Sequence, residues 1–232
     1  MAAWIMHLRI AEKLFGMGLD VIEAPFYVGT LAPDCGRMIG DFGYDPPKEL
    51  THWHKNLPDR LQSNLLFYEK YCKNERDPYR RSFYLGYFIH IVVDTFYIDG
   101  FVMPVIHANM DQWHRDPWSI KKDWFNYDYT FADTHPDFRP LKMLCGMEKF
   151  DNVYLDYFSK DAITERLRQL PGIFARHHGD PDHVNRFITV EMLDNFAAEC
   201  PEQIRKLLIK LGEYKYKEKN QKQHLQSAEK CV

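Results

Sequence analysis

The most apolar run of the chain contains two residues that are costly to bury. Residues 83–98 read FYLGYFIHIVVDTFYI, and His90 and Asp94 interrupt the aromatic and aliphatic side chains. The run is shorter than the roughly 20 apolar residues that a bilayer span needs, and a carboxylate in hydrocarbon is expensive. Its length therefore predicts a buried central helix over 78–98, which the other segments must cover.

His90 and Asp94 would lie together on that helix. Residues four apart share a helix face. An ionised carboxylate buried alone costs several kcal/mol, so Asp94 must have a partner or bind a metal. Histidine is the commonest metal ligand, and carboxylates readily join it. Two interpretations stay open: a hydrogen-bonded pair that holds helices together, or part of a metal site.

The remaining segments predict an all-α protein. Apolar residues at helical spacing indicate amphipathic helices that end near glycines such as Gly16, Gly172 and Gly212. The segment 25–50 is dense in Gly and Pro, which predicts a long, packed and functional irregular loop. Residues 101–140 predict short helices mixed with loops. The predicted helices are 3–16, 58–74, 78–98, 159–176 and 185–212.

Length and charge favour one domain without a nucleic-acid-binding surface. The chain has 232 residues, with 30 Lys and Arg against 33 Asp and Glu and a net charge of −3. One domain is favoured at this length, and a bulk nucleic-acid binder would be clearly basic. We expect a helical domain over 1–214. The polar tail 215–232 is expected to fray.

The cysteines and the N-terminus predict a cytoplasmic protein. The five cysteines are scattered and include no C-x-x-C pair, which excludes a thiolate zinc finger and argues against a disulfide framework. The first residues, MAAWIMH, lack a basic region followed by an apolar run. Free cysteines without such a segment are typical of a reducing compartment.

Three more candidate ligands precede the central run. His7 lies on an apolar helix face, where a core histidine is the common alternative. Asp34 follows Ala-Pro, where a turn or cap aspartate is the alternative. His52 and His54 alternate in Thr-His-Trp-His, so an extended chain would point them in opposite directions and only one would be a ligand.

In this order the candidates form the pattern of a known family. The four pieces are WxxHxxIA over 4–11, GxxAPD over 29–34, TH over 51–52 and LGYxxHxxxD over 85–94. Together they resemble the zinc-dependent phospholipase C family, which is related in fold to the S1/P1-type nucleases. The resemblance covers residues 1–98 and extends at most to Asp128. It implies an all-α, single-domain multi-helix bundle of phospholipase C and P1-nuclease type.

The same resemblance implies a zinc cluster and a role for each candidate. His7 would help to hold one zinc ion, Asp34, His52 and His90 would hold another, and Asp94 would bridge the two. Asp34 would also accept a proton. Two zinc ions sharing a carboxylate generate hydroxide near neutral pH and neutralise the charge on a phosphodiester under attack. Nitrogen and oxygen ligands without thiolates suit zinc or a similar transition metal.

The chain departs from the family pattern at three places. Secreted relatives bind metal through the amino group of an N-terminal tryptophan, whereas Trp4 stands behind three residues. They also have a histidine where this chain has Gly100. For a third zinc ion the chain offers His107-x-x-x-Asp111, with His114 nearby, at a shorter separation than in those relatives. The third zinc is therefore less well supported than the first two.

Two further groups of polar residues have a plainer interpretation. RHHGDPDH over 176–183 is rich in ligand types, but its Gly, Pro and Asp residues favour a solvated loop. Asp123 and Asp128 lie in an aromatic segment. They are either groups near the substrate or part of a helix that packs on the core, and the second interpretation is favoured.

The favoured function is a zinc-dependent phosphoric-ester hydrolase of phospholipase C type. Its substrate would be a small phosphodiester or a phospholipid headgroup. The alternative is a non-catalytic metal-binding or structural helical protein with a degenerate cluster. HD-type phosphohydrolases need an adjacent His-Asp pair, which the sequence lacks. Membrane contact and oligomeric state are left open by the sequence.

Overall fold

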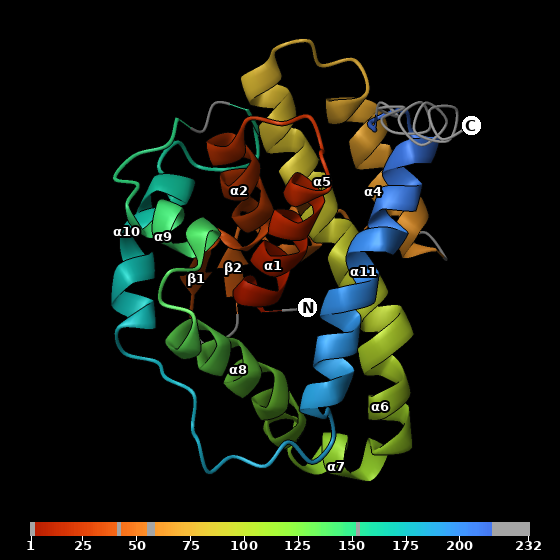
Figure 1. The fold of residues 1–232 in the computed structure, drawn as a ribbon, viewed down its shortest axis with the longest axis vertical. Coiled ribbons are helices and arrows are strands. Elements are labelled where there is room, and N and C mark those ends of the chain that lie inside the picture. Colours follow the sequence, from red (N-terminus) through yellow and green to blue (C-terminus); the bar gives the residue numbers. More distant parts are fainter. Residues whose placement is uncertain (1–2, 41–42, 55–58, 152–153, 215–232) are drawn as a thin grey trace, which may run out of the picture.

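The protein is built almost wholly of helices, which confirms the all-α prediction (Figure 1). The computed structural model describes residues 3–40, 43–54, 59–151 and 154–214. Within these residues the strands form one antiparallel hairpin, in which Arg37 pairs with Asp45 and Ile39 with Gly43. The predicted tail 215–232 lies outside the described residues.

The elements follow one another along the chain with short connections up to residue 145. The helices are α1 (Trp4–Gly16), α2 (Glu23–Leu31), α3 (Lys48–Thr51), α4 (Arg60–Phe67), α5 (Pro78–Tyr97), α6 (Met103–Ala108), α7 (Met110–Arg115), α8 (Pro117–Thr134), α9 (Arg139–Cys145), α10 (Ala162–Phe174) and α11 (Val190–Lys210). The strands are β1 (Arg37–Ile39) and β2 (Gly43–Asp45). A 3₁₀ turn covers Ala32–Asp34, and π-helical turns cover Tyr68–Cys72 and Ile98–Val102.

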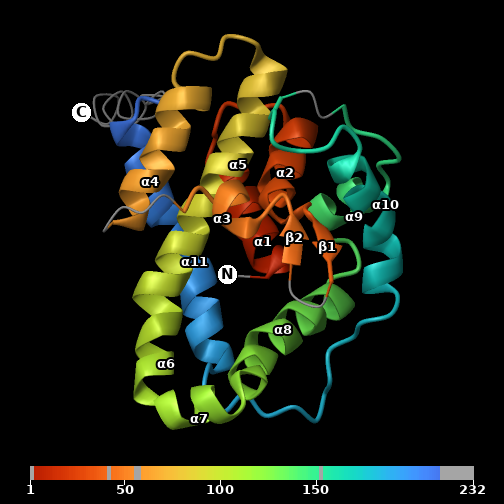
Figure 2. The ribbon, with the colours of Figure 1, turned by 180° about the vertical axis from the view of Figure 1, so that it is seen from behind.

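Helix α5 is the central helix predicted from the apolar run. It packs against α1, α2, α4 and α11 (Figures 1 and 2). Asp77 caps its start by accepting the Arg80 backbone N–H at 2.7 Å, and Pro78 occupies the first turn. By length and composition alone, Pro78–Ala108 could cross a membrane, but 61% of its most apolar window is buried within the protein. This burial is typical of a core helix.

Helices α2 and α5 touch through their backbones. A Cβ placed on Gly86 would lie 2.1 Å from the Phe26 carbonyl oxygen, and one on Gly29 would lie 2.0 Å from the Phe83 carbonyl oxygen. Real Cβ atoms do not come this close, so each glycine makes room for the other helix. This contact brings the end of α2 against the His90 face of α5.

The prediction of an irregular loop over 25–50 is wrong for its first part. Helix α2 covers Glu23–Leu31, and a 3₁₀ turn, the hairpin and α3 occupy most of the rest. Pro25 lies in the first turn of α2, where its missing N–H breaks no helical hydrogen bond. Gly29 serves the helix contact rather than a turn. Pro25 and Gly29 are residue types typical of loops, but here they lie within a helix, and the packing of that helix explains Gly29.

Of the three helix ends that we predicted from glycines, two are correct and one is wrong. Helix α1 ends at Gly16 as predicted, and Gly212 follows α11 with a φ of 80°, a value that favours glycine. Gly172 does not end a helix, because α10 continues through it to Phe174. Within 101–140, α8 is longer than the short helices that we predicted.

The start of α1 is capped from another helix. Ala3 provides no side-chain cap, but Asp128 on α8 accepts the backbone N–H groups of Ile5 and Met6 through Oδ2, at 2.7 and 3.4 Å. Burial of Asp128 raises the pKa of this carboxyl to about 7, although the two backbone hydrogen bonds work in the opposite direction. Asp128 therefore fixes the end of the helix that carries His7.

The first prediction concerns the contact between α2 and α5. Gly86→Ala should lower the free energy of unfolding by at least about 2 kcal/mol, because its Cβ must push the Phe26 carbonyl away. Gly16→Ala is the matched control, since its Cβ would meet nothing within 4 Å, and we expect a change below about 1 kcal/mol. Urea unfolding measures both. Equal stability of the two variants would contradict the close contact.

The second prediction concerns Asp128. Its pKa is higher in the folded state than in the unfolded state, so folding stability should fall as pH rises from about 4 to about 7. Asp128→Asn keeps an acceptor oxygen and should remove this part of the slope, which amounts to at most about 4 kcal/mol. Urea unfolding of both metal-free proteins at about pH 5 and about pH 8 tests this. If the stability of the wild type and of Asp128→Asn changed equally between these pH values, the prediction would be wrong.

Candidate metal centre

Five side chains from four parts of the chain converge beside the α2–α5 contact. Two groups of ligand atoms, each within 4.8 Å of one another, could hold a metal ion: His7, His90 and Asp94, and Asp34, His52 and His90. These are the five residues that the sequence resemblance picked out. His90 belongs to both groups, so they form one continuous cluster.

His90 is oriented by the helix that packs on it. Its Nδ1 lies 2.7 Å from the Thr30 carbonyl oxygen, which can only accept, so Nδ1 carries the proton. The lone pair is thereby assigned to Nε2, which faces the cluster. A histidine ligand is commonly fixed in this way by a hydrogen bond from its other ring nitrogen.

His52 has the same arrangement at the end of α3. Its Nδ1 lies 2.9 Å from the Thr51 hydroxyl oxygen and 3.2 Å from the Lys48 carbonyl oxygen. A proton on Nδ1 can be donated to either oxygen, and this tautomer leaves the lone pair on Nε2. Tyr87 on α5 donates a hydrogen bond to the Thr51 carbonyl and ties this turn to the central helix. Trp53, with a φ of 54°, turns the chain away directly after His52. His54 is exposed, so only one histidine of the pair enters the cluster, as predicted.

The Nε2 atoms of His52 and His90 face each other. They are 3.4 Å apart, and in the tautomer with both protons on Nδ1 their lone pairs point into the same space. Asp94 Oδ2 lies 3.4 Å from His52 Nε2 and 3.6 Å from His90 Nε2. Acceptors gathered in this way repel one another unless a cation lies among them.

His7 completes the cluster from α1. Its ring stacks on His90 with centroids 3.8 Å apart, and its Nε2 lies 3.3 Å from Asp94 Oδ1. Both ring nitrogens are buried. Nε2 faces the Asp94 carboxylate, and Nδ1 has no hydrogen-bond partner among the described residues. The two oxygens of Asp94 thus face different histidines.

The cluster has the protonation state that a metal requires. Burial lowers the pKa of His52, and burial with the neighbouring His7 lowers the pKa of His90 to about 3, so both imidazoles are neutral. Burial by itself would raise the pKa of Asp94, but the adjacent His7 and His90 lower it overall. Neutral histidines with ionised carboxylates are the ligand forms that bind zinc. The residues present therefore fit the metal that the sequence resemblance implied.

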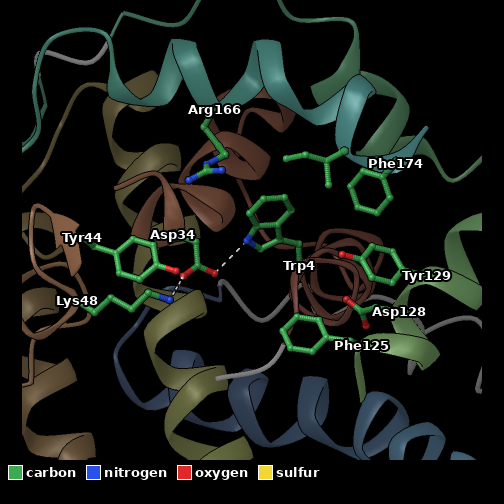
Figure 3. A pocket seen from close by; sticks show the side chains of 11 residues that line it. Trp4, Asp34, Tyr44, Lys48, Phe125, Asp128, Tyr129, Arg166 and Phe174 are labelled. Carbon is green, nitrogen blue, oxygen red and sulfur yellow. Dashed lines mark hydrogen bonds and ion pairs between the residues drawn. The ribbon is translucent and has the colours of Figure 1, made fainter. Parts of the chain in front are cut away.

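Asp34 differs from the other ligands because it reaches a pocket. Trp4 Nε1 donates to its Oδ2 at 3.0 Å, and Lys48 Nζ lies 3.4 Å from its Oδ1 (Figure 3). Burial would raise the pKa of Asp34, but Lys48 and the two histidines lower it below its ordinary value. Asp34 is therefore an ionised carboxylate at the boundary between the cluster and the pocket.

The pocket beside Asp34 has a volume of about 260 Å³. One side carries charged residues, and the other is aromatic and apolar (Figure 3). Its lining comprises Ala3, Trp4, Asp34, Tyr44, Lys48, Phe125, Asp128, Tyr129, Arg166, Ile173 and Phe174. A pocket in contact with a candidate metal ligand is the natural place for a substrate.

The other candidate groups do not join the cluster. His107 and Asp111 lie on different helices, because the chain breaks at Asn109, and both are exposed, as is His114. They are not among the converging ligand groups in the described part of the chain. The expected helical spacing for a third metal is thus wrong.

The polar residues around 176–183 hold a loop against α8. His183 Nε2 lies 2.9 Å from Asp123 Oδ1, and Asp123 Oδ2 accepts the backbone N–H groups of Phe187 and Ile188. His178 pairs with Asp133 at 2.8 Å. These contacts account for Asp123 as a residue that packs a loop on the helix, in agreement with the favoured interpretation.

Sequence reasoning missed the basic residues of the pocket. Lys48 lies one helical turn before His52, and this spacing was a usable signal. Arg166 has no such signal, because it reaches the pocket only through the packing of α10 beside the hairpin, where Arg37 and Glu165 form a salt bridge. No sequence spacing relates Arg166 to Asp34.

Comparison with known proteins agrees with this geometry. The family model described as zinc dependent phospholipase C matches residues 3–114, a segment that contains all five converging ligands. No curated protein and no solved structure gives a significant match to the chain. Helices α8, α10 and α11 lie beyond the matched segment. Residues 3–114, just under half of the chain, are therefore similar to the zinc-dependent phospholipase C family.

Proposed function

We propose that the protein is a zinc-dependent hydrolase of a phosphoric ester, with two zinc ions in the cluster described above. The observation that carries this proposal is the convergence of His52 Nε2 and His90 Nε2, 3.4 Å apart and next to Asp94, in groups of ligand atoms that could hold a metal ion. Bound zinc lowers the pKa of water and neutralises charge on phosphoryl oxygens. The similarity of residues 3–114 to the zinc-dependent phospholipase C family supports the same reaction class.

The ligand roles follow from which atoms face one another. Asp34, His52 and His90 would hold one zinc ion, and His7 would hold the other. Asp94 would bridge them, because its Oδ1 lies near His7 and its Oδ2 near His52 and His90. The hydrogen bond from His90 to Thr30 keeps the shared ligand in place during the reaction.

Asp34 is the proposed proton acceptor. Its side chain is 9% exposed, against 3% for Asp94, and it contacts the pocket. The Trp4 indole N–H and the Lys48 ammonium orient the carboxylate and keep it ionised. The aromatic wall limits water in the pocket, which strengthens electrostatic interactions with the substrate. Asp34 would thus take the proton of the attacking water, while Trp4 and Lys48 hold the Asp34 carboxylate in place.

The alternative is a structural metal site without catalysis. A structural zinc site is closed by protein ligands, whereas a catalytic one keeps a position open. The contact between Asp34 and the pocket favours a catalytic site over a structural one, because a ligand in the pocket can approach the candidate metal ligands from that side. The hydrogen-bonded pair without metal, the third interpretation, accounts for His90 and Asp94 but not for the convergence of His7, Asp34 and His52 on the same place.

The third prediction concerns zinc content. His90→Ala removes the ligand common to both groups and should reduce bound zinc from about two ions per chain to near zero. Elemental mass spectrometry after zinc loading and removal of excess measures this. His54→Ala is the matched control, because His54 is a neighbouring but exposed histidine and should leave the zinc content unchanged. Zinc should also raise the thermal midpoint of the wild type but not of His90→Ala.

An absence of zinc from the wild type after loading would overturn the proposed function. Retention of zinc by His90→Ala would overturn the ligand assignment. If His90→Ala unfolds even without metal, a second variant, His90→Gln, tests the same point with a side chain that keeps much of the volume.

The fourth prediction separates the proton acceptor from the fold. Asp34→Asn should lower kcat for bis(4-nitrophenyl) phosphate by about 100-fold or more, because the amide cannot accept the proton. Its thermal midpoint without metal should match that of the wild type, since Asn still accepts the Trp4 N–H. Spectrophotometric assay and thermal unfolding give the two quantities. Unchanged kcat at equal zinc content would remove Asp34 from the mechanism.

A further inference from the structure

We propose that Arg166 and Lys48 bind an anionic group of the substrate, which is therefore a small phosphoester with at least two negative charges. This inference rests on the proposed function, because it names the substrate class of the same site. It concerns the half of the pocket that lies farthest from the aromatic wall. The geometry of Arg166 carries it.

Arg166 is a cation without a carboxylate partner in the described part of the chain. Its Nη2 donates to the Gly36 carbonyl oxygen at 3.0 Å, and its Nη1 donates to Gln169 Oε1 at 3.2 Å. Both acceptors are neutral. Its Nε is buried and has no hydrogen-bond partner among the described residues. A guanidinium held in this way keeps a positive charge that no carboxylate of the described residues offsets, and an incoming anion can pair with it.

The direction of Arg166 places that charge in the pocket. The side chain descends from α10 toward Asp34 and Trp4 (Figure 3). Its guanidinium carbon lies 5.4 Å from the centre of the Trp4 ring, a contact that fixes the planar group over the indole. Arg166 is therefore oriented before any ligand arrives, which favours binding.

Lys48 adds a second positive charge on the same side. Its Nζ lies 3.4 Å from Asp34 Oδ1 and 4.6 Å from the centre of the Tyr44 ring. Asp34 Oδ1 also lies 3.6 Å from His52 Nε2, and a zinc ion held there, as proposed above, would neutralise the carboxylate. The lining then holds two cations, while the remaining acid, Asp128, has its Oδ2 engaged by the start of α1.

This charge distribution favours one class of headgroup. Arg166 and Lys48 repel a cation that approaches their side of the pocket and attract an anion. A phosphomonoester dianion, or a phosphoester with a second anionic group, would be neutralised by them. Arginine suits this role because its forked donors match phosphate and carboxylate oxygens.

The side of the pocket away from Lys48 determines which group the substrate can carry besides its anionic group. Phe125, Tyr129 and Phe174 line the side of Trp4 away from Lys48 (Figure 3). This wall suits a compact ring or apolar group. The volume of about 260 Å³ lies below the range of roughly 300–1,000 Å³ for drug-sized ligands, so long acyl chains would stay outside.

Phenylphosphonate and its monomethyl ester test the proposal directly. Both carry the same ring and resist hydrolysis, but the first is a dianion above neutral pH and the second a monoanion. Calorimetry on the zinc-loaded protein should give a dissociation constant at least about 10-fold lower for phenylphosphonate. Equal affinity for the two phosphonates would overturn the proposal.

Variants assign the preference to Arg166. Arg166→Met should weaken phenylphosphonate binding by about 10- to 100-fold and the monoester much less. Arg166→Lys keeps the charge and should restore part of the preference, which a purely structural role of the guanidinium would not allow. Arg37→Met is the matched control, since Arg37 forms a surface salt bridge with Glu165 and should leave both affinities unchanged. An unchanged preference in Arg166→Met would also overturn the assignment.

Zinc content measured on each variant separates the two proposals. Arg166 is not a ligand, so its variants should hold as much zinc as the wild type. Full zinc content with no dianion preference contradicts this inference alone. A wild type without zinc contradicts the proposed function, and the phosphonate comparison on that protein still decides whether the pocket selects dianions.

Discussion

The backbone contact between α2 and α5 is the constraint on which the metal centre depends. Gly29 and Gly86 allow each helix to approach a carbonyl oxygen of the other. At this separation the Thr30 carbonyl lies 2.7 Å from His90 Nδ1, which fixes both the tautomer and the orientation of the ligand shared by the two groups. A larger side chain at either glycine would move that carbonyl and release the ring. The packing of two core helices thus determines the chemistry of a side chain one helical turn beyond Gly86.

Cation binding at the rest of the cluster would be coupled to folding. His7, His52 and His90 come from three different elements, and each is buried beside Asp94. Without a cation, burial of the ionised carboxylates opposes the packing that brings these residues together. A bound cation would reverse the sign of this interaction, so part of its binding free energy would stabilise the fold. The external cap that Asp128 supplies to α1 holds His7 in position independently of the metal.

The sequence predicted the parts of this site that local spacing encodes. His90 and Asp94 follow from four-residue spacing in an apolar helix, and the resemblance to a family added His7, Asp34 and His52 in their correct order. The same reasoning failed where packing overrides local signals: Pro25 and Gly29 were interpreted as loop residues, Gly172 as a helix end, and His107 and Asp111 as partners on one helix. Arg166 and the capping role of Asp128 were invisible, because each acts on a segment more than 100 residues away. Tertiary contacts of this length leave no periodicity in the sequence.

The segment that matches the family model and the segment beyond it contribute different parts of the candidate site. Residues 3–114 supply every converging ligand of the described cluster, whereas Phe125, Tyr129, Arg166 and Phe174 of the pocket lie beyond the match. Attack on a phosphoryl group needs the same metal ligands whatever the substrate, but recognition of the substrate depends on the surrounding wall. A family can therefore keep its metal centre while the wall changes from one member to another. In this chain the wall combines a guanidinium without a carboxylate partner in the described residues with three aromatic rings. If the protein hydrolyses a phosphoester as we propose, the charge and size of this wall, rather than the metal ligands, would determine which substrate reaches Asp34.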